Sequence, residues 1–150
     1  MVCLVDRWFE EDTPIFIHPK DPFKRIDIVA SDRAVKVEID GHKVAEAVTA
    51  MHLYETLLPV RYYLPLTSID PAILTSSKTR SQCPYKGEAE YYNVNVGGKE
   101  HKDIVWFYNR PIVECAAVTG LCCFYNEKVD ISIQSGGKWE KLERPKTHFA

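Results

Sequence analysis

The sequence predicts a mainly β fold of antiparallel strands, and two observations predict it. Apolar and polar residues alternate over several short stretches, which is the pattern of strands that bury one face. Turn-forming pairs stand next to these stretches at Asp40-Gly41, Gly97-Gly98 and Gly136-Gly137, where hairpins reverse direction. Because helical periodicity is scarce by comparison, we expect hairpins to dominate the architecture.

Size and charge narrow the choice of partner. With 150 residues, of which 45% are hydrophobic, the chain can bury the core of one domain without disulfides or a metal. The 19 basic residues nearly balance the 21 acidic ones, which argues against nucleic acid or an anionic membrane as partner and favours a small neutral or acidic ligand.

Cysteine usage and the N-terminus predict a cytoplasmic location. The five cysteines are odd in number, and Cys122 and Cys123 are adjacent and poorly placed to bridge each other, so we expect reduced thiols. The apolar stretch from Met1 to Val5 is too short for a signal peptide.

The chain divides into an arm and one domain. Residues 1–32 are expected to form an extended arm packed on the domain, because prolines interrupt its first part. Its anchors would be Trp8, Phe9 and Phe16. Residues 33–150 then form a single domain.

The first half of this domain begins with a hairpin over residues 35–44, where valine and isoleucine alternate with charged residues. Residues 45–58 fit either a helix or a strand, and Pro59 must end any helix. Residues 60–64 are rich in β-forming residues and lie between two prolines, which predicts a short strand at an edge or beside a bulge. Asp70 is placed to cap a short helix that starts at Pro71.

The second half begins with a polar loop, expected over residues 75–82. A second hairpin is expected to join residues 89–96 to residues 104–108. Further short strands over 121–125, 129–133 and around Trp139 close the domain.

Polar and aromatic residues concentrate in three strings: ETLLPVRYYLP at 55–65, TRSQCPYKG at 79–87 and VWFYNRP at 105–111. Over about residues 33–128 the sequence resembles domain-of-unknown-function family 427. The resemblance implies a β-tent fold, in which two antiparallel sheets meet at an angle with a pocket between them, together with one or two short helices.

The resemblance does not extend to a metal or a nucleotide. Many β-tent relatives bind zinc through paired CxxC motifs, but this sequence contains none, so we expect no metal and no cofactor. The family also carries a nucleotidyltransferase label, for which the chain lacks both paired aspartates after a Gly-Ser and a phosphate-binding glycine loop.

The candidate catalytic residues are Glu55, Arg61, Tyr63, Tyr85 and Lys86. Glu55 is either a solvated carboxylate or, beside an aromatic strand, a general acid or base with a raised pKa. Arg61 either pairs with Glu55 or, like Lys86, holds a ligand carboxylate or enolate. Tyr63 and Tyr85 either fill the core or donate hydrogen bonds to an oxyanion.

The candidate substrate-binding residues are Tyr62, Thr79, Cys83, Trp106 and Tyr108. Trp106 and Tyr108 share one side of a strand and, with a tyrosine of the 62–63 pair, form an aromatic box or fill the core. Cys83 is a nucleophile only if a histidine lies near it in space, and none occurs in its motif. His52 would share a helical face with Glu55 if this segment were a helix.

These residues predict a metal- and cofactor-independent small-molecule enzyme of acid/base type, an isomerase, cyclase, dehydratase or hydrolase acting on an oxygenated metabolite. The alternative is a non-catalytic module that holds a small molecule in an aromatic cage, and a third interpretation is a purely structural interaction protein. A homodimer formed through an exposed strand edge is compatible with each.

Overall fold

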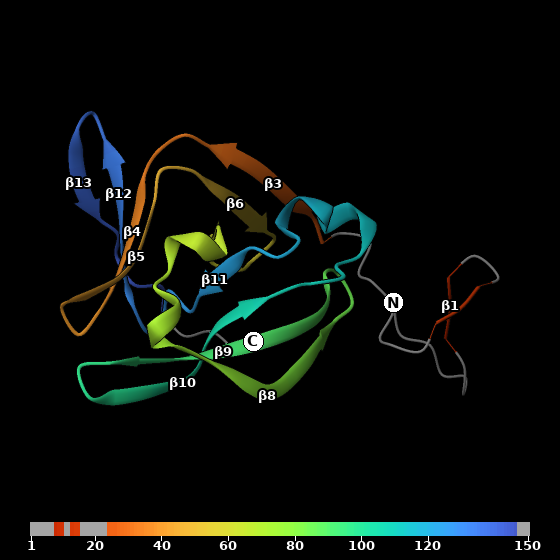
Figure 1. The fold of residues 1–150 in the computed structure, drawn as a ribbon. Coiled ribbons are helices and arrows are strands. Elements are labelled where there is room, and N and C mark those ends of the chain that lie inside the picture. Colours follow the sequence, from red (N-terminus) through yellow and green to blue (C-terminus); the bar gives the residue numbers. More distant parts are fainter. Residues whose placement is uncertain (1–7, 11–12, 16–23, 147–150) are drawn as a thin grey trace.

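The computed structural model describes residues 8–10, 13–15 and 24–146. Within them the chain forms two large antiparallel sheets that meet at an angle, which confirms the predicted fold class (Figure 1). The seven-stranded sheet has the order β3 (Ile26–Ser31), β6 (Ala50–Glu55), β7 (Arg61–Leu64), β11 (Cys122–Phe124), β10 (Lys99–Phe107), β9 (Gly87–Val96) and β8 (Leu74–Cys83). The four-stranded sheet has the order β13 (Lys138–Lys141), β12 (Asp130–Ser135), β4 (Val35–Ile39) and β5 (His42–Ala47).

The hairpins form where the turn residues predicted them. Asp40 and Gly41 both adopt positive φ, +50° and +81°, as a tight turn between β4 and β5 requires. The two diglycine pairs join β9 to β10 and β12 to β13 in the same way.

The N-terminal region differs in part from the expectation. Residues 26–31, which we expected in the arm, form β3 and pair with β6 from Ile26 opposite Glu55 to Ser31 opposite Ala50. Upstream, β1 (Trp8–Glu10) and β2 (Thr13–Ile15) form a separate two-stranded sheet. Phe16 lies outside the described residues, and the packing of the arm on the domain stays a prediction.

Three segments of the domain correct the sequence prediction. The ambiguous residues 45–58 contain β6, which is buried on one face and, except at Tyr54, on the other, so apolar and polar residues do not alternate clearly along it. The segment between the two prolines forms β7 in the interior of the sheet, because Pro59 and Pro65 stand outside the strand and remove none of its ladder hydrogen bonds. Residues 75–82, expected as a loop, belong to the edge strand β8, most of whose side chains are exposed.

Three short 3-10 helices connect strands within residues 24–146: η1 (Leu66–Ser68), η2 (Pro71–Ile73) and η3 (Val113–Val118). The carboxylate of Asp70 caps η2 as expected by accepting a hydrogen bond from the Ala72 amide at 2.9 Å.

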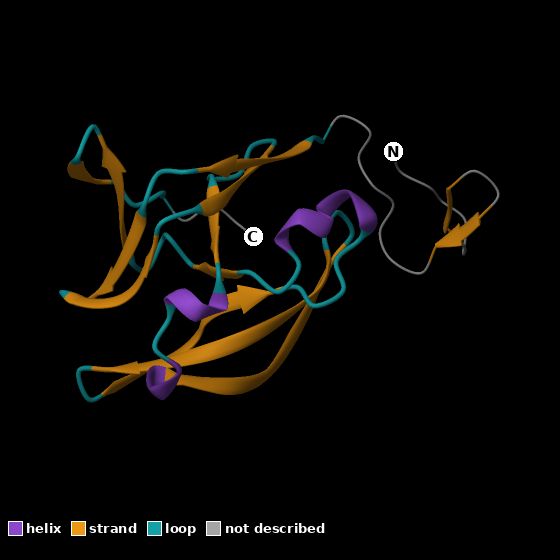
Figure 2. Cartoon of the chain, turned by 45° about the horizontal axis from the view of Figure 1, so that its top comes forward, coloured by secondary structure: helices purple, strands orange, loops and turns teal. Residues whose placement is uncertain are grey.

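The seven-stranded sheet has a core on each face. On one face, residues such as Leu64, Val94 and Phe124 pack against Val35 and Ile131 of the four-stranded sheet. On the other face, a second core is covered by η3 (Figure 2) and includes Leu53, Tyr63, Trp106, Tyr108, Cys115 and Val118. This second face contains most of the residues that the sequence marks for chemistry.

Candidate functional site

The strand register places the candidate residues on the second face. Arg61 pairs with Leu53, two residues before Glu55, so both charged side chains lie on the same side of the sheet. Tyr63 and Trp106 both pair with Cys123, and they lie on this side as well. The resemblance implies a pocket between the sheets, whereas these residues lie on the face turned away from the four-stranded sheet.

Two lysines hold Glu55. Its side chain is only 4% exposed at the end of β6. Lys86 donates a hydrogen bond through Nζ to Glu55 Oε1, and the Nζ of Lys24 lies 3.0 Å from Oε2. The cluster of two ammonium groups and one carboxylate has a net charge of +1, because the two lysines outnumber the glutamate.

The tight turn between β8 and β9 positions Lys86. The Lys86 carbonyl accepts a hydrogen bond from the Ile112 amide at 2.9 Å. Gly87, at φ +114°, comes so close to the next segment that a Cβ would lie 3.2 Å from the Arg110 carbonyl oxygen. The thiol of Cys115 in η3 donates to the Tyr85 carbonyl at 3.4 Å. The turn is therefore fixed from one side by the segment that leads into η3.

Ion pairing keeps Glu55 ionised. Burial alone raises its pKa, but the hydrogen bonds and charges of Lys86 and Lys24 outweigh burial and lower the pKa below its ordinary value. For Lys24, burial lowers the pKa, and the pairing with Glu55 more than offsets it. The raised carboxyl pKa, one of the two alternatives that the sequence leaves for Glu55, is therefore absent in the free protein.

Aromatic and thiol groups surround the cluster. Lys24 Nζ lies 4.7 Å from the centroid of the Tyr85 ring. Tyr108 is buried, and burial, followed by the nearby Cys83 and other groups that include Glu55, raises its pKa well above the ordinary range. Tyr108 is thus a neutral phenol, and within the described residues its hydroxyl has no hydrogen-bond partner. Cys83, partly exposed at the end of β8, has no hydrogen bond to a histidine in this part of the chain.

Arg61 forms a second cluster on the same face. Its guanidinium donates two parallel hydrogen bonds to Glu127, from Nη1 to Oε1 at 2.5 Å and from Nη2 to Oε2 at 2.9 Å. It also donates to the side-chain oxygen of Asn126, whose amide donates to the Val60 carbonyl at 2.9 Å. Burial alone lowers the pKa of Arg61, but the Glu127 hydrogen bonds raise it. Arg61 therefore pairs with Glu127 and not, as one expectation had it, with Glu55.

The chain itself fills the expected aromatic box. The Arg61 guanidinium carbon lies 5.1 Å from the Trp106 ring centroid, where a ligand cation would sit. Trp106 Nε1 donates to the Tyr63 hydroxyl at 3.0 Å, and both side chains are buried. Tyr63 and Trp106 thus form a packed core contact rather than an open cage.

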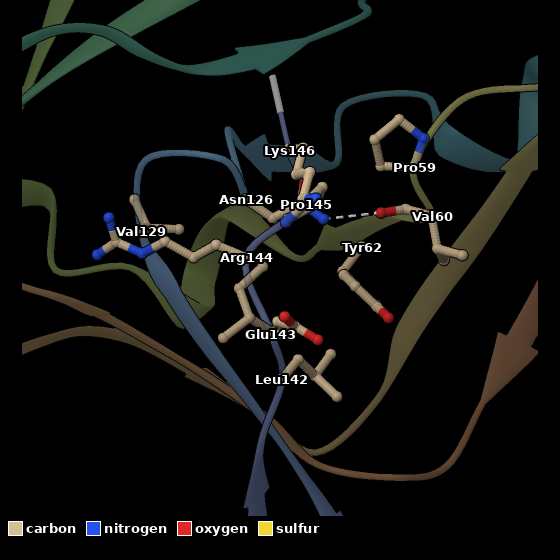
Figure 3. A pocket seen from close by; sticks show the side chains of 11 residues that line it. Pro59, Val60, Tyr62, Asn126, Val129, Leu142, Glu143, Arg144, Pro145 and Lys146 are labelled. Atoms are coloured by element: carbon tan, nitrogen blue, oxygen red, sulfur yellow. Dashed lines mark hydrogen bonds between the residues drawn. The ribbon is translucent and has the colours of Figure 1, made fainter. Parts of the chain in front are cut away.

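Three other candidates lie elsewhere. Tyr62 follows Arg61 along β7 and therefore points to the opposite face, where it lines a cavity between the sheets (Figure 3). His52 also lies on this opposite face, since β6 is a strand and not a helix, and its ring packs edge-on against Tyr62 with centroids 4.8 Å apart. Thr79 of the edge strand β8 donates a hydrogen bond to Asp103 Oδ2 at 2.7 Å, beside a β-bulge in β10, and so links these two strands.

Three residues of the two clusters are absent from the sequence prediction. Lys24 lies in the segment assigned to the arm, and only the pairing of β3 with β6 brings it to Glu55. Glu127 and Asn126 belong to a short turn after β11. From the sequence alone, polar residues in such a turn are expected to be exposed to solvent. Their distance from Arg61 along the chain gives a single sequence no signal for this contact.

The described residues show neither a metal-binding cluster nor a membrane-spanning helix. They contain no group of three or more histidine, cysteine, aspartate or glutamate side chains placed to share a metal ion. No helix among them is long and apolar enough to cross a membrane.

Comparison with known proteins supports the family resemblance. None of the curated proteins shows a significant match to the chain. The model of a family described as "Domain of unknown function (DUF427)" matches residues 27–135, from the second residue of β3 to the end of β12. Because this match covers well over half of the 150 residues, the chain belongs to the DUF427 family.

Proposed function

We propose that this protein is an acid/base enzyme that transfers a proton on a small oxygenated organic anion, using its own side chains at Glu55 and Lys86. One observation carries the proposal: a buried carboxylate is shared by two lysines beside a neutral phenol with no hydrogen-bond partner in the described residues. Structural ion pairs need neither the excess positive charge nor the spare hydroxyl.

Substrate binding uses the positive charge of the cluster. The Lys86 side chain is 12% exposed and that of Lys24 26%, so both lysines keep some surface accessible to solvent although they are mostly buried. A carboxylate close to a ketone, as in a 2-oxo or 3-oxo acid, matches this arrangement, because the lysines neutralise the acid and the Tyr108 hydroxyl donates to the developing enolate oxygen.

Glu55 acts as the base once the anion is bound. The lysines keep its pKa low in the free protein. When the ammonium groups turn to the substrate, burial becomes the dominant influence and raises the Glu55 pKa. Glu55 then takes the proton from the carbon next to the carbonyl, and the C–H electron pair forms the enolate. The same proton, or one from solvent, returns to the carbon and restores the carboxylate.

The other candidates have supporting roles. Arg61 is committed to Glu127, so it is a positioning residue that fixes the aromatic part of this face. Tyr63 is fully buried and holds Trp106. Tyr85 provides the ring against which Lys24 rests.

The test is proton exchange in D2O. Pyruvate, phenylpyruvate and acetoacetate are incubated with the protein, and loss of the C–H signal next to the carbonyl is followed by proton NMR. We expect exchange above that of heat-denatured protein for at least one compound, and a loss of about 100-fold or more in Glu55→Gln. Glu38→Gln, the same change on the four-stranded sheet, is the matched control.

Two results contradict the proposal. Unchanged exchange in Glu55→Gln removes the role of Glu55, and no exchange of any compound contradicts the substrate class. A compound that binds at this site without exchange supports the second candidate, a non-catalytic binding module. That candidate is favoured by the full occupation of both Glu55 oxygens by lysines in the free protein.

A further inference from the structure

A cavity of about 490 Å³ lies between the two sheets, on the face of β7 opposite to the Glu55 site. Its volume falls within the range of roughly 300–1,000 Å³ typical of small-molecule pockets. Figure 3 shows Tyr62 of β7 and the segment after β13, which carries Leu142 and Arg144, around this space. None of the residues of the Lys24–Glu55–Lys86 cluster lines it.

The wall of the cavity is mostly apolar. Val129 and Ile131, both almost fully buried, line it together with Pro59, Val60 and Leu142. The backbone amide of Leu142 donates to the Ile131 carbonyl at 2.8 Å, which ties the C-terminal segment to β12 and makes it a fixed side of the cavity. An apolar wall of this kind favours a hydrocarbon body in the ligand.

Polar groups at the cavity favour one negative charge. Arg144 pairs with Asp130 at 3.0 Å, and Lys141 lies 3.5 Å from the same carboxylate. Glu143 and Lys146 also line the cavity. Three positive side chains and two negative ones therefore lie around the opening, which gives a net charge of +1. Within the described residues, Lys146 forms no ion pair, so its ammonium group is available.

Tyr62 supplies a neutral donor. Burial raises the pKa of its hydroxyl, and Arg33 offsets this only in part, so the phenol keeps its proton at neutral pH. Its hydroxyl has no hydrogen-bond partner in the described part of the chain. Asn126 also lines the cavity, but its amide group is already used by Arg61 and Val60. The groups that can hold a ligand carboxylate therefore include the Tyr62 phenol and the Lys146 ammonium group, beside Arg144, which bonds Asp130 through Nε alone.

We propose that this cavity is a second ligand site, separate from the Glu55 site, which binds an apolar, ring-sized monocarboxylate. The hydrocarbon body lies against Pro59, Val60 and Leu142, which line the cavity and are only partly buried. The carboxylate accepts a hydrogen bond from Tyr62 and pairs with Lys146. This proposal does not depend on the proposed function, because it concerns another face of the sheet.

The experiment uses naphthalene-2-carboxylate as the probe, with the neutral naphthalene-2-carboxamide as its isostere. Binding to the full chain is measured by calorimetry and mapped by amide chemical shifts in NMR. We expect the carboxylate to bind with a Kd of about 1 mM or tighter. Its shift changes should centre on residues 59–62, 129–131 and 142–146, and the carboxamide should bind about fivefold more weakly or worse.

Three variants and one control identify the site. Tyr62→Phe and Lys146→Glu should each weaken binding about fivefold or more, and Leu142→Trp should block it by filling the space. Lys138→Glu, the same charge change on exposed β13, is the matched control and should bind as the parent does. If Leu142→Trp fails to fold, as thermal melting will show, the other two variants still decide.

Several outcomes overturn the proposal. Equal binding of the carboxamide removes the charge requirement, and unchanged binding in Tyr62→Phe and Lys146→Glu removes the assigned contacts. Shift changes centred on Glu55 and Lys86 place the probe at the other site, and no binding rules out the class of ligand. Loss of proton exchange in Glu55→Gln has no bearing on these readouts, so the two proposals fail independently.

Discussion

Replacement of Glu55 by glutamine should destabilise the protein strongly, because it leaves two lysine charges without their shared counter-ion. Removing one partner of a buried ion pair costs roughly 3–5 kcal/mol. Here the exposed fractions are 4% for Glu55, 12% for Lys86 and 26% for Lys24, so the lysines can partly turn to water. We therefore expect a loss near the lower limit, about 3 kcal/mol in the free energy of unfolding.

Thermal melting and urea unfolding at pH 7 measure this loss. For a domain of this size, 1 kcal/mol corresponds to about 2–4 °C in Tm, so Glu55→Gln should melt about 6–12 °C below the parent. It should stay folded at 25 °C, since domains have about 5–15 kcal/mol of stability. Lys86→Met should cost more than Lys24→Met, because Lys86 is the more buried lysine.

The pH dependence provides a second, independent readout. The folded-state pKa of Glu55 lies below its ordinary value of 4.5. A lowered carboxyl pKa contributes stability that is complete above the unfolded pKa and is lost as the pH falls through the folded one. The Tm gap between the parent and Glu55→Gln should be constant between pH 6 and 8 and close in acid below 4.5. A difference in the free energy of unfolding below about 1 kcal/mol at pH 7 would refute the ion-pair reasoning, and so would a Tm gap that persists in acid.

Three further predictions concern packing and accessibility. Tyr63→Phe removes the acceptor of the buried Trp106 Nε1 and should cost about 1–3 kcal/mol in urea unfolding, and a loss near zero would contradict the contact. Gly87→Ala should destabilise more than Gly98→Ala, since both glycines have positive φ but only Gly87 meets the backbone of a neighbouring segment. Among the four described cysteines, native alkylation followed by peptide mass spectrometry should label Cys83 first, because the other three are buried, and earlier labelling of a buried one would argue against this packing.

The sequence predicts the hairpins well because their signals are local. A diglycine or Asp-Gly pair sets the turn, and alternation sets the buried face of strands such as β4. The same rule fails for β6, which is largely buried on both faces except at Tyr54, and for β8, which is exposed over most of its length. In both strands, alternation is weak because the two faces have similar surroundings.

The site could be predicted only in part, for a similar reason. Residue type and motif single out Glu55 and Lys86, but Lys24 reaches Glu55 only through the pairing of β3 with β6. Strand geometry does separate Arg61 from Tyr62, because neighbours along a strand face opposite ways. Period-two reasoning therefore places Arg61 and Tyr62 on opposite faces of the sheet, where β7 holds them.

Stability alone does not explain why this face keeps charges at Glu55, Lys24 and Lys86. Buried ion pairs can often be replaced by apolar residues of similar size with no loss, or with a gain of about 1–4 kcal/mol. Glu55 lies beside Ile26 in the strand pairing, next to a core that would accept a leucine. The triple variant Glu55→Leu/Lys24→Met/Lys86→Met should therefore unfold at or above the Tm of the parent, while proton exchange on the oxo acids is lost. A triple variant that is both less stable than the parent and unfolded at 25 °C would mean that the ions are structural. A stable, inactive one would tie the cluster to chemistry, since folding would not need the charges that catalysis does.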